Sequence, residues 1–397
     1  MDVVNDKSIN NQSKAVLAAK GIFPLILLAI FLAIFLKVGP LGVFRAGFPP
    51  VEELTFERVA FPSSGLVKIH MINGGPESVT IAQVMIDEAY WEHAVAPSRK
   101  IGRLDKAVID IPYPWVQGEP IEISVVSSTG LTFTYQVAVA TQSPEINSRY
   151  VMTFAMLGIY VGVIPVFLGL LWLPFLSGIS KRWLDFFMSL TVGLLIFLGV
   201  DALEGALELT DQVASAFQGV GLVLLGVVCI PILTNALSNT LQEQYTTGPL
   251  WLSLLIALGI GLHNLGEGLA VGSAYAVGEV ALGTSLVLGF LLHNTTEGLG
   301  IIAPLAHSRP KLKTLIVLGM VAGLPTILGA WIGGFSYSPR ASVFFLAIGA
   351  GAIIQVIWVM IRNLMAENKF GISSPLNAAG LVAGLIIMYA TGLFIAI

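Results

Sequence analysis

Charged residues are scarce in this chain. Only 11% of its 397 residues are charged and 55% are hydrophobic, whereas roughly a quarter of the residues in a soluble domain carry charge. The mean hydropathy is +0.85. This balance excludes an ordinary soluble globular protein. It predicts an integral membrane protein that has the lipid bilayer as one of its partners.

The sequence also has no basic tract and no pair of cysteines. Because the net charge is −4 and lysines and arginines are not clustered, we expect no nucleic-acid partner. Cys229 is the only cysteine in this sequence, so it can form neither an internal disulfide nor a cysteine-based metal site. Metal ligands would have to come from histidine and carboxylate side chains.

A basic segment precedes a short apolar run near the start of the sequence. Lys7, Lys14 and Lys20 come before the apolar residues 21–36. This pattern is typical of a signal peptide or of an uncleaved signal anchor. Because no small-x-small cleavage pattern follows, we expect residues 1–38 to be a cytoplasmic N-terminus and membrane anchor. A cleaved signal peptide is the alternative.

Residues 39–148 have the pattern of a β-rich domain. Apolar and polar residues alternate over 65–71, 121–125 and 131–139, and a Ser/Gly turn at 127–130 separates the last two runs. Period-two runs on both sides of a turn predict a β-hairpin. Further strand-like runs divided by proline and glycine predict a β-sandwich of about immunoglobulin size. Its partner is not indicated by the sequence.

The third region, residues 149–397, is almost continuously apolar. Polar breaks divide it into eight runs, each long enough to cross a bilayer as a helix. We therefore expect a mainly α membrane protein in which an eight-helix bundle follows the anchor and the β-sandwich. The expected spans are 150–176, 183–208, 214–237, 250–277, 280–306, 312–334, 341–362 and 376–397.

Basic residues give the bundle a predicted orientation. If every span crosses, the basic residues of three connections fall on one side, and positive loops mark the cytoplasm. This places the β-domain and the C-terminus outside the cytoplasm, in a multi-pass protein of the cell membrane. Arg340 is the exception, in an outer connection. The cytoplasmic set consists of Lys181, Arg182, Arg309, Lys311, Lys313, Arg362 and Lys369.

Two copies of a His-Asn-x-x-Glu-Gly-Leu motif lie inside neighbouring apolar spans. The first contains His263 and Glu267, and the second contains His293 and Glu297. In a helix, residues four apart lie on the same face. Ionisable groups within a membrane are costly and tend to be functional. Two imidazoles and two carboxylates suit Zn²⁺, which they would render formally neutral. The alternative is that each histidine forms only a helix–helix hydrogen bond.

Other polar residues in the spans are secondary candidates. Asn264 and Asn294 follow the motif histidines and suit either an additional metal ligand or an inter-helix hydrogen bond equally well. Asp201 and Glu204 lie on one helical face of the second span, where we expect a metal pathway or a proton site. Gln355, in the seventh span, is a weaker pathway candidate, with a hydrogen bond between helices as its alternative role.

At these motifs the chain resembles the ZIP family of divalent metal transporters, which have eight transmembrane helices. The resemblance covers about residues 150–397 and leaves the anchor and the β-domain unexplained. It implies a site formed by His263, Glu267, His293 and Glu297, with Asn264 and Asn294 beside them. It also implies transport of Zn²⁺ or a similar ion towards the cytoplasm by alternating access.

Three differences from the family pattern bear on that expectation. Gly266 and Thr296 stand where many members have a proline, so the expected kink must come from elsewhere or be absent. Thr326 and Asn294 stand where members with two adjacent metal sites have carboxylates, which predicts a single tight site here. Finally, the short connection 239–248 has no histidine-rich segment.

We therefore expect a non-enzymatic transporter of Zn²⁺, with Fe²⁺, Mn²⁺ or Cd²⁺ as other candidate ions. A homodimer is left open. A zinc-dependent intramembrane hydrolase is the alternative, with Asp201 as its general base. A lipid-sized cleft at the site would favour the enzyme, and a narrow polar path the transporter. A metal-sensing receptor that uses the β-domain is a third interpretation.

Overall fold

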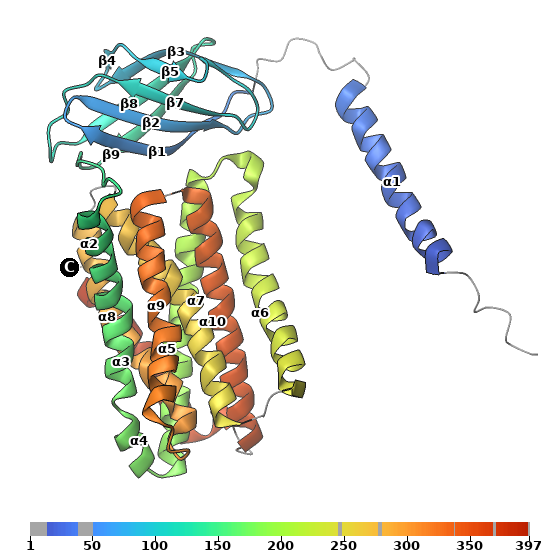
Figure 1. Cartoon of the computed structure of the whole chain (residues 1–397), viewed down its shortest axis with the longest axis vertical. Helices are drawn as coiled ribbons and strands as arrows, with labels where there is room; N and C mark the ends of the chain where they lie inside the picture. Colours follow the sequence, from blue (N-terminus) through green and yellow to red (C-terminus); the bar gives the residue numbers. More distant parts are fainter. Residues whose placement is uncertain are drawn as a thin grey trace, which may run out of the picture. The chain divides into compact units, whose positions relative to one another are not determined.

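A computed structural model describes residues 14–38, 51–244, 248–276, 280–336, 338–367 and 371–395. The chain forms two compact units that divide between Val51 and Glu52. The first contains α1 (Lys14–Val38), a helix with an apolar stretch at Ile22–Ile34 (Figure 1). The predicted apolar run is thus helical. Its role as an anchor and its cleavage remain predictions, and Lys7 lies outside the described residues.

The second unit begins with a β-sandwich-like region formed by two antiparallel sheets, here called the β-region. One sheet has the strand order β1-β2-β7-β5, and the other has β4-β3-β8-β9 with β6 paired to β3. The strands are β1 (Leu54–Ser63), β2 (Leu66–Asn73), β3 (Val79–Ile86), β4 (Ala89–Tyr90), β5 (Ala94–Ala96), β6 (Lys100–Ile101), β7 (Lys106–Ile111), β8 (Ile121–Ser127) and β9 (Thr132–Val137).

Alternation along the strands explains how the β-region folds. In β2, Val67, Ile69 and Met71 are fully buried, while Lys68 and His70 between them are partly exposed. The predicted hairpin is present, because β8 and β9 pair from Ile121 opposite Val137 to Val126 opposite Thr132. Apolar side chains from both sheets form one core between them.

The rest of the second unit is helical, and it contains eight helical segments long and apolar enough to cross a membrane. These correspond to the eight spans predicted from the sequence. The helices are α2 (Ser148–Gly158), η1 (Ile159–Val163), α3 (Ile164–Leu170), α4 (Leu173–Gly178), α5 (Lys181–Glu208), η2 (Leu209–Gln212), η3 (Ser215–Phe217), α6 (Gly219–Gln244), α7 (Pro249–Ala276), α8 (Val280–Ile302), η4 (Ala303–Leu305), α9 (Leu312–Ser336), α10 (Pro339–Glu367), η5 (Gly371–Ser373) and α11 (Pro375–Ile395).

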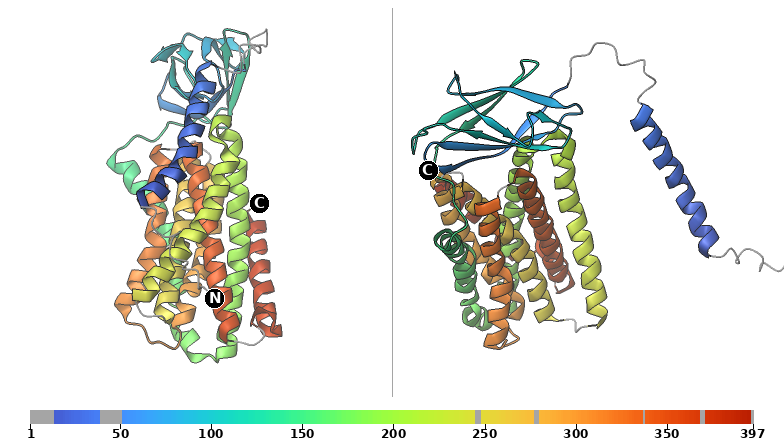
Figure 2. Two further views of the ribbon diagram at one scale, coloured as in Figure 1. Left: turned by 90° about the vertical axis from the view of Figure 1, so that its right-hand side faces the viewer. Right: turned by 45° about the horizontal axis from the view of Figure 1, so that its top comes forward.

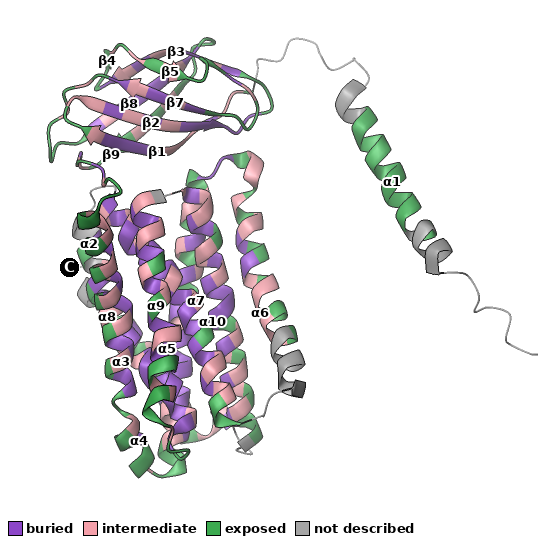
Figure 3. Cartoon of the chain, viewed as in Figure 1, coloured by how far each residue is buried: buried purple, intermediate pink, exposed green. Residues whose placement is uncertain are grey.

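Helix α7 is the centre of the bundle. It packs against α8, α9 and α10, and it is the span with the largest buried share (Figures 1 and 3). Helix α5 packs against α10 and α11 (Figure 2), whereas α3 packs against α8. α7 therefore contacts α8 and α9, and it also contacts α10, which packs against α5. A side chain on α7 can be held from several directions.

Small residues permit this close packing. A Cβ atom at Gly268 of α7 would lie 2.0 Å from the Thr326 carbonyl oxygen of α9, and one at Gly298 of α8 would lie 2.2 Å from the Val166 carbonyl oxygen of α3. Only glycine allows the backbones to approach this closely. Both glycines belong to the His-Asn-x-x-Glu-Gly-Leu motifs, so the motif residues are also packing residues.

Hydrogen bonds connect the β-region to the adjacent ends of the bundle helices. The Glu53 carboxylate accepts hydrogen bonds from the Ser215 backbone N–H, at 2.7 Å, and from the Ser215 hydroxyl. Arg58 donates to the Phe335 carbonyl oxygen at 3.2 Å. Ser215 lies between α5 and α6, and Phe335 lies at the end of α9. The β-region thus contacts two separate connections of the bundle.

Candidate metal site

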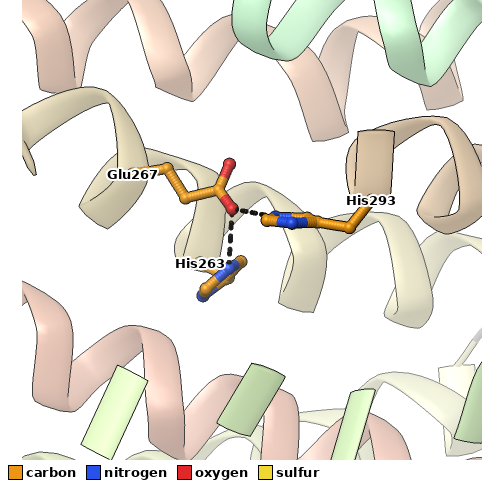
Figure 4. A group of neighbouring side chains, drawn as sticks. All are labelled: His263, Glu267 and His293. Carbon is orange, nitrogen blue, oxygen red and sulfur yellow. Dashed lines mark hydrogen bonds and ion pairs between the residues drawn. The ribbon is translucent and has the colours of Figure 1, made fainter. Parts of the chain in front are cut away.

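Three of the motif side chains meet inside the bundle. His263 and Glu267 lie one turn apart on α7, and His293 reaches them from α8. The exposed fractions are 5%, 2% and 7%, respectively. His263 Nε2 lies 3.1 Å from Glu267 Oε1, and His293 Nε2 lies 2.5 Å from the same oxygen (Figure 4). The i, i+4 spacing on α7 predicted from the sequence thus places two of the ligand types on one face.

Asn294 holds the other oxygen of the same carboxylate. Its Nδ2 donates to Glu267 Oε2 at 2.8 Å and to the Val161 carbonyl oxygen at 3.0 Å. Val161 lies in the π-helical turn η1, four residues before Pro165. Because proline has no N–H, the Val161 carbonyl lacks its usual helical donor, and the Asn294 amide takes that place. Sequence reasoning missed Val161, although Pro165 was a signal that a carbonyl would be free there.

Asn264 connects α7 to α9 in a similar way. Its Nδ2 donates to the Ala322 carbonyl oxygen at 3.1 Å. Both asparagine amides therefore make inter-helix hydrogen bonds, one of the two roles considered from the sequence. Both Oδ1 atoms remain buried without a hydrogen-bond partner among the described residues. They are oxygen atoms still able to accept a hydrogen bond or a cation.

Glu297 is buried but lies outside the compact group. Only 3% of the residue is exposed. The group whose ligand atoms all lie within 4.8 Å of one another contains His263, Glu267 and His293. Both Glu297 carboxylate oxygens and the Thr326 hydroxyl are buried with no hydrogen-bond partner in the part of the chain that the structure describes. Three of the four expected ligands are thus together, and the fourth, Glu297, lies outside this group.

The charges of this cluster make it suitable for a dication. Two carboxylates buried within electrostatic reach of each other, Glu267 and Glu297, are costly to hold ionised. In a tetrahedral zinc site with bonds of about 2.0–2.1 Å, neighbouring ligand atoms lie about 3.3 Å apart. The separations between the two histidine nitrogens and Glu267 Oε1 need only modest adjustment to reach that value. The donor set fits Zn²⁺ chemically.

The structure also locates the secondary candidates. Asp201 and Glu204 on α5 are exposed, and Asp201 lies within electrostatic reach of His263 and His293. These two acids lie towards the end of α5 that faces the β-region, because Ser215 follows shortly after α5. Gln355 on α10 is half-buried. The three are not part of the compact group.

Helices α7 and α8 run unbroken through both motifs. The helical assignment thus continues through Gly266 and Thr296, where many family members have a proline. The irregular backbone lies in the neighbouring spans. The π-helical turn η1 precedes Pro165, and α9 contains Pro325. Asn294 and Asn264 donate to carbonyls close to these two prolines, Val161 and Ala322.

Comparison with known proteins agrees with this arrangement. Residues 235–392 match the family model described as ZIP Zinc transporter. This segment, less than half of the chain, is similar to the ZIP family. It contains both motifs and most of the bundle, from the later part of α6 into α11. No curated protein gave a significant match to the chain.

The ZIP match indicates a metal transporter, and the eight spans make the chain a multi-pass membrane protein. A transporter family accords with a non-enzymatic function, and the match gives no support to the intramembrane hydrolase. The match begins at residue 235, well after the last strand of the β-region, which ends at Val137. The β-region is therefore an addition to the part of the chain that the ZIP model covers.

Proposed function

We propose that the chain transports Zn²⁺ towards the cytoplasm and that the ion binds between α7 and α8. The observation that carries this proposal is the buried group of His263, Glu267 and His293, whose ligand atoms lie within 4.8 Å of one another. Glu297 is the remaining buried carboxylate and completes a four-ligand set when the ion is present. Asn264 and Asn294 support this set through their inter-helix hydrogen bonds.

Zinc is the ion that best suits two imidazoles and two carboxylates. Fe²⁺, Mn²⁺ and Cd²⁺ accept related donors and are the competing substrates. We propose one tight site. Thr326 and Asn294 contribute no carboxylate for a second one, although their neutral oxygens are buried.

The acidic face of α5 is the proposed approach path. Asp201 and Glu204 are exposed, and Asp201 is within electrostatic reach of the histidines. A cation is attracted first to these carboxylates and then to Glu267. Gln355 on α10, which packs against α5, is a further polar group proposed for this path. Rearrangement of the bundle then exposes the ion to the other side, as alternating access requires.

We propose that the bundle lies in the cell membrane with its basic end in the cytoplasm and the β-region and C-terminus outside. The N-terminal lysines remain inside if α1 is an uncleaved anchor. Labelling can test this, because Cys229 is the only native cysteine. In a Cys229→Ala background, a membrane-impermeant thiol reagent should label Glu145→Cys in intact cells and leave Lys311→Cys unlabelled. The reverse pattern would contradict the orientation.

Metal uptake into proteoliposomes tests the function. We expect Zn²⁺ uptake by the full chain, and its loss in His263→Gln, Glu267→Gln and His293→Gln. A panel of divalent ions, with the pH gradient varied, identifies the preferred substrate and the driving force. His93→Gln is the matched control, because this histidine lies in the β-region. Zinc uptake that is unchanged in Glu267→Gln would refute the site.

A further inference from the structure

A cavity lies at the end of the bundle opposite the β-region, here called the basic-end cavity. Its volume is about 640 Å³, and its lining comes from the start of α5, the start of α7, the end of α10, α6 and the segment after η4. Ligand pockets in proteins commonly measure about 300–1,000 Å³. The cavity therefore has the size of a binding site for a small organic molecule.

The basic-end cavity is separated from the metal group by a layer of buried apolar residues. On α7 the cavity lining ends at Leu255, and Ile256 and Ile260 follow before His263. On α5 the lining ends at Met188, and Leu195 and Leu198 follow before Asp201. On α10, Val356 and Ile353 lie inward from the lining residue Val359. We call Ile256, Ile260, Leu195, Leu198, Ile353 and Val356 the apolar layer.

Charge in the cavity lining favours an anion. Lys181 and Arg362 both contribute to the lining, with Asp185 as the single carboxylate. His307 is a further nitrogen donor. Arg362 is exposed, and it forms no ion pair with a carboxylate among the described residues. A phosphate group is well matched by arginine and lysine.

Hydrogen-bond donors in the cavity lining also favour an anionic ligand. Trp251 lines the cavity, and its indole N–H is buried without a hydrogen-bond partner among the described residues. An indole can only donate, so this group calls for an acceptor oxygen. The side-chain amides of Asn235 and Asn363 provide further donors in the lining.

The remaining lining is apolar. Leu184, Leu252 and Leu255 belong to it, together with Met188 and Val359. A free inorganic ion makes no favourable contact with apolar side chains, whereas the glycerol and acyl part of a lipid packs against them. Basic pockets between transmembrane helices are known to bind the headgroups of anionic lipids.

We propose that the basic-end cavity binds a phosphate group carried on an apolar molecule, with an anionic phospholipid as its source. Arg362 and the Trp251 indole contact the phosphate oxygens, and the leucines contact the glycerol and acyl carbons. The lining joins α5 and α10 to α7 and η4, so the bound lipid stabilises the packing of these helices at this end. The proposal does not depend on which metal is transported.

The experiment uses the full chain in nanodiscs of three kinds. One contains phosphatidylcholine alone, the second contains added phosphatidylglycerol, and the third contains phosphatidylcholine with inorganic phosphate in the buffer. Native mass spectrometry counts retained phosphatidylglycerol, and thermal unfolding measures stabilisation. We expect phosphatidylglycerol to be retained and to raise the Tm, and inorganic phosphate to have little effect.

Two variants and one control make the test specific. Arg362→Gln should retain phosphatidylglycerol about tenfold more weakly, because a charge-assisted hydrogen bond to phosphate is lost. Trp251→Phe keeps the ring but removes the donor, and should weaken retention in the same direction. Arg309→Gln removes a charge from the same end without touching the lining, and should behave as the unmodified protein does.

Three outcomes would overturn the proposal. Equal weakening in Arg309→Gln and Arg362→Gln would show a diffuse basic surface rather than a site. A full Tm increase with inorganic phosphate alone would show that the ligand is the free ion. Altered zinc dependence of uptake in Arg362→Gln, identical with and without phosphatidylglycerol, would show that the cavity is a metal passage.

Discussion

Glu57 of β1 and Arg340 of α10 form an ion pair at 2.9 Å although they are 283 positions apart in the sequence. Only 13% of the Glu57 side chain is exposed, and its other oxygen pairs with Lys106 at 2.7 Å. The Arg340 guanidinium lies over the Phe217 ring, 4.2 Å from its centroid. Arg340 was the basic residue that did not fit the predicted orientation. Its place is explained by this contact with the β-region.

The first prediction concerns this ion pair. Glu57→Gln and Arg340→Gln should each lower the stability of the full chain, and the double variant should lose less than the sum. We expect a coupling of about 1 kcal/mol, because the pair is partly exposed. Thermal unfolding of the four proteins in detergent measures it. Lys68→Gln, which breaks the exposed Lys68–Asp110 pair within the sheet, should show no coupling to Arg340→Gln.

The second prediction concerns Asn294. Asn294→Ala removes the donor to Glu267 Oε2 and to the Val161 carbonyl, both buried. Leaving such acceptors unpaired costs about 1–3 kcal/mol each, so the metal-free protein should unfold at a markedly lower temperature. Asn294→Asp also loses the donor, yet it adds a carboxylate beside Glu297. Its stabilisation by added Zn²⁺ should exceed that of the unmodified protein. Equal Zn²⁺ stabilisation in both would contradict this account.

The third prediction concerns the contact of α3 with α8. Gly298→Ala places a methyl group against the Val166 carbonyl, so we expect a loss of about 1–3 kcal/mol from overpacking. Gly205→Ala is the matched control, since a Cβ at this helical glycine of α5 meets nothing within 4 Å. The control should be neutral or slightly stabilising. Thermal unfolding of both variants decides, and an unchanged Tm in Gly298→Ala would argue against the close packing.

The fourth prediction concerns acid sensitivity of the β-region. Burial, followed by the nearby charges of Arg58 and Lys68, lowers the pKa of His70. Lys106 acts in the same direction, and Glu57 opposes it. Below pH of about 6.5 the unfolded chain binds more protons at this residue than the folded chain, so stability falls as the pH decreases. His70→Gln should lose less Tm than the unmodified protein between pH 8 and pH 5.5. Parallel losses would contradict the assignment.

The fifth prediction concerns the proposed approach path. Asp201→Asn removes a negative charge near His263 and His293, so the KM for Zn²⁺ uptake should rise several-fold more than the maximal rate falls. Glu208→Gln, at the exposed end of the same helix, is the control with a smaller effect. Raising the ionic strength should reduce the difference between Asp201→Asn and the unmodified protein. A KM that stays constant would remove Asp201 from the path.

Periodicity was sufficient to predict the local elements. The eight spans and the hairpin of β8 and β9 follow from patterns within about thirty residues, and the structure confirms them. The meeting of His263, Glu267 and His293 was also accessible, because a repeated motif on neighbouring helices limits the ways in which they can face each other.

The contacts between distant parts of the chain could not be predicted from sequence periodicity. The position of Glu297 outside the compact group depends on how α8 is rotated against α7, which its sequence spacing does not determine. The π-helical turn at η1 depends on Pro165 together with a donor supplied from another helix, Asn294. The pairing of Arg340 with Glu57 joins two regions whose patterns carry no information about each other.

The apolar layer has a consequence for leakage. Between Leu255 and His263, α7 advances eight residues, about 12 Å at 1.5 Å per residue. Over that distance the layer offers hydrocarbon side chains, in which an unsolvated ion is strongly disfavoured. While the bundle keeps this arrangement, neither a metal ion nor a hydrated proton has a continuous wet route past the layer. The membrane potential can therefore be maintained across the protein in this arrangement.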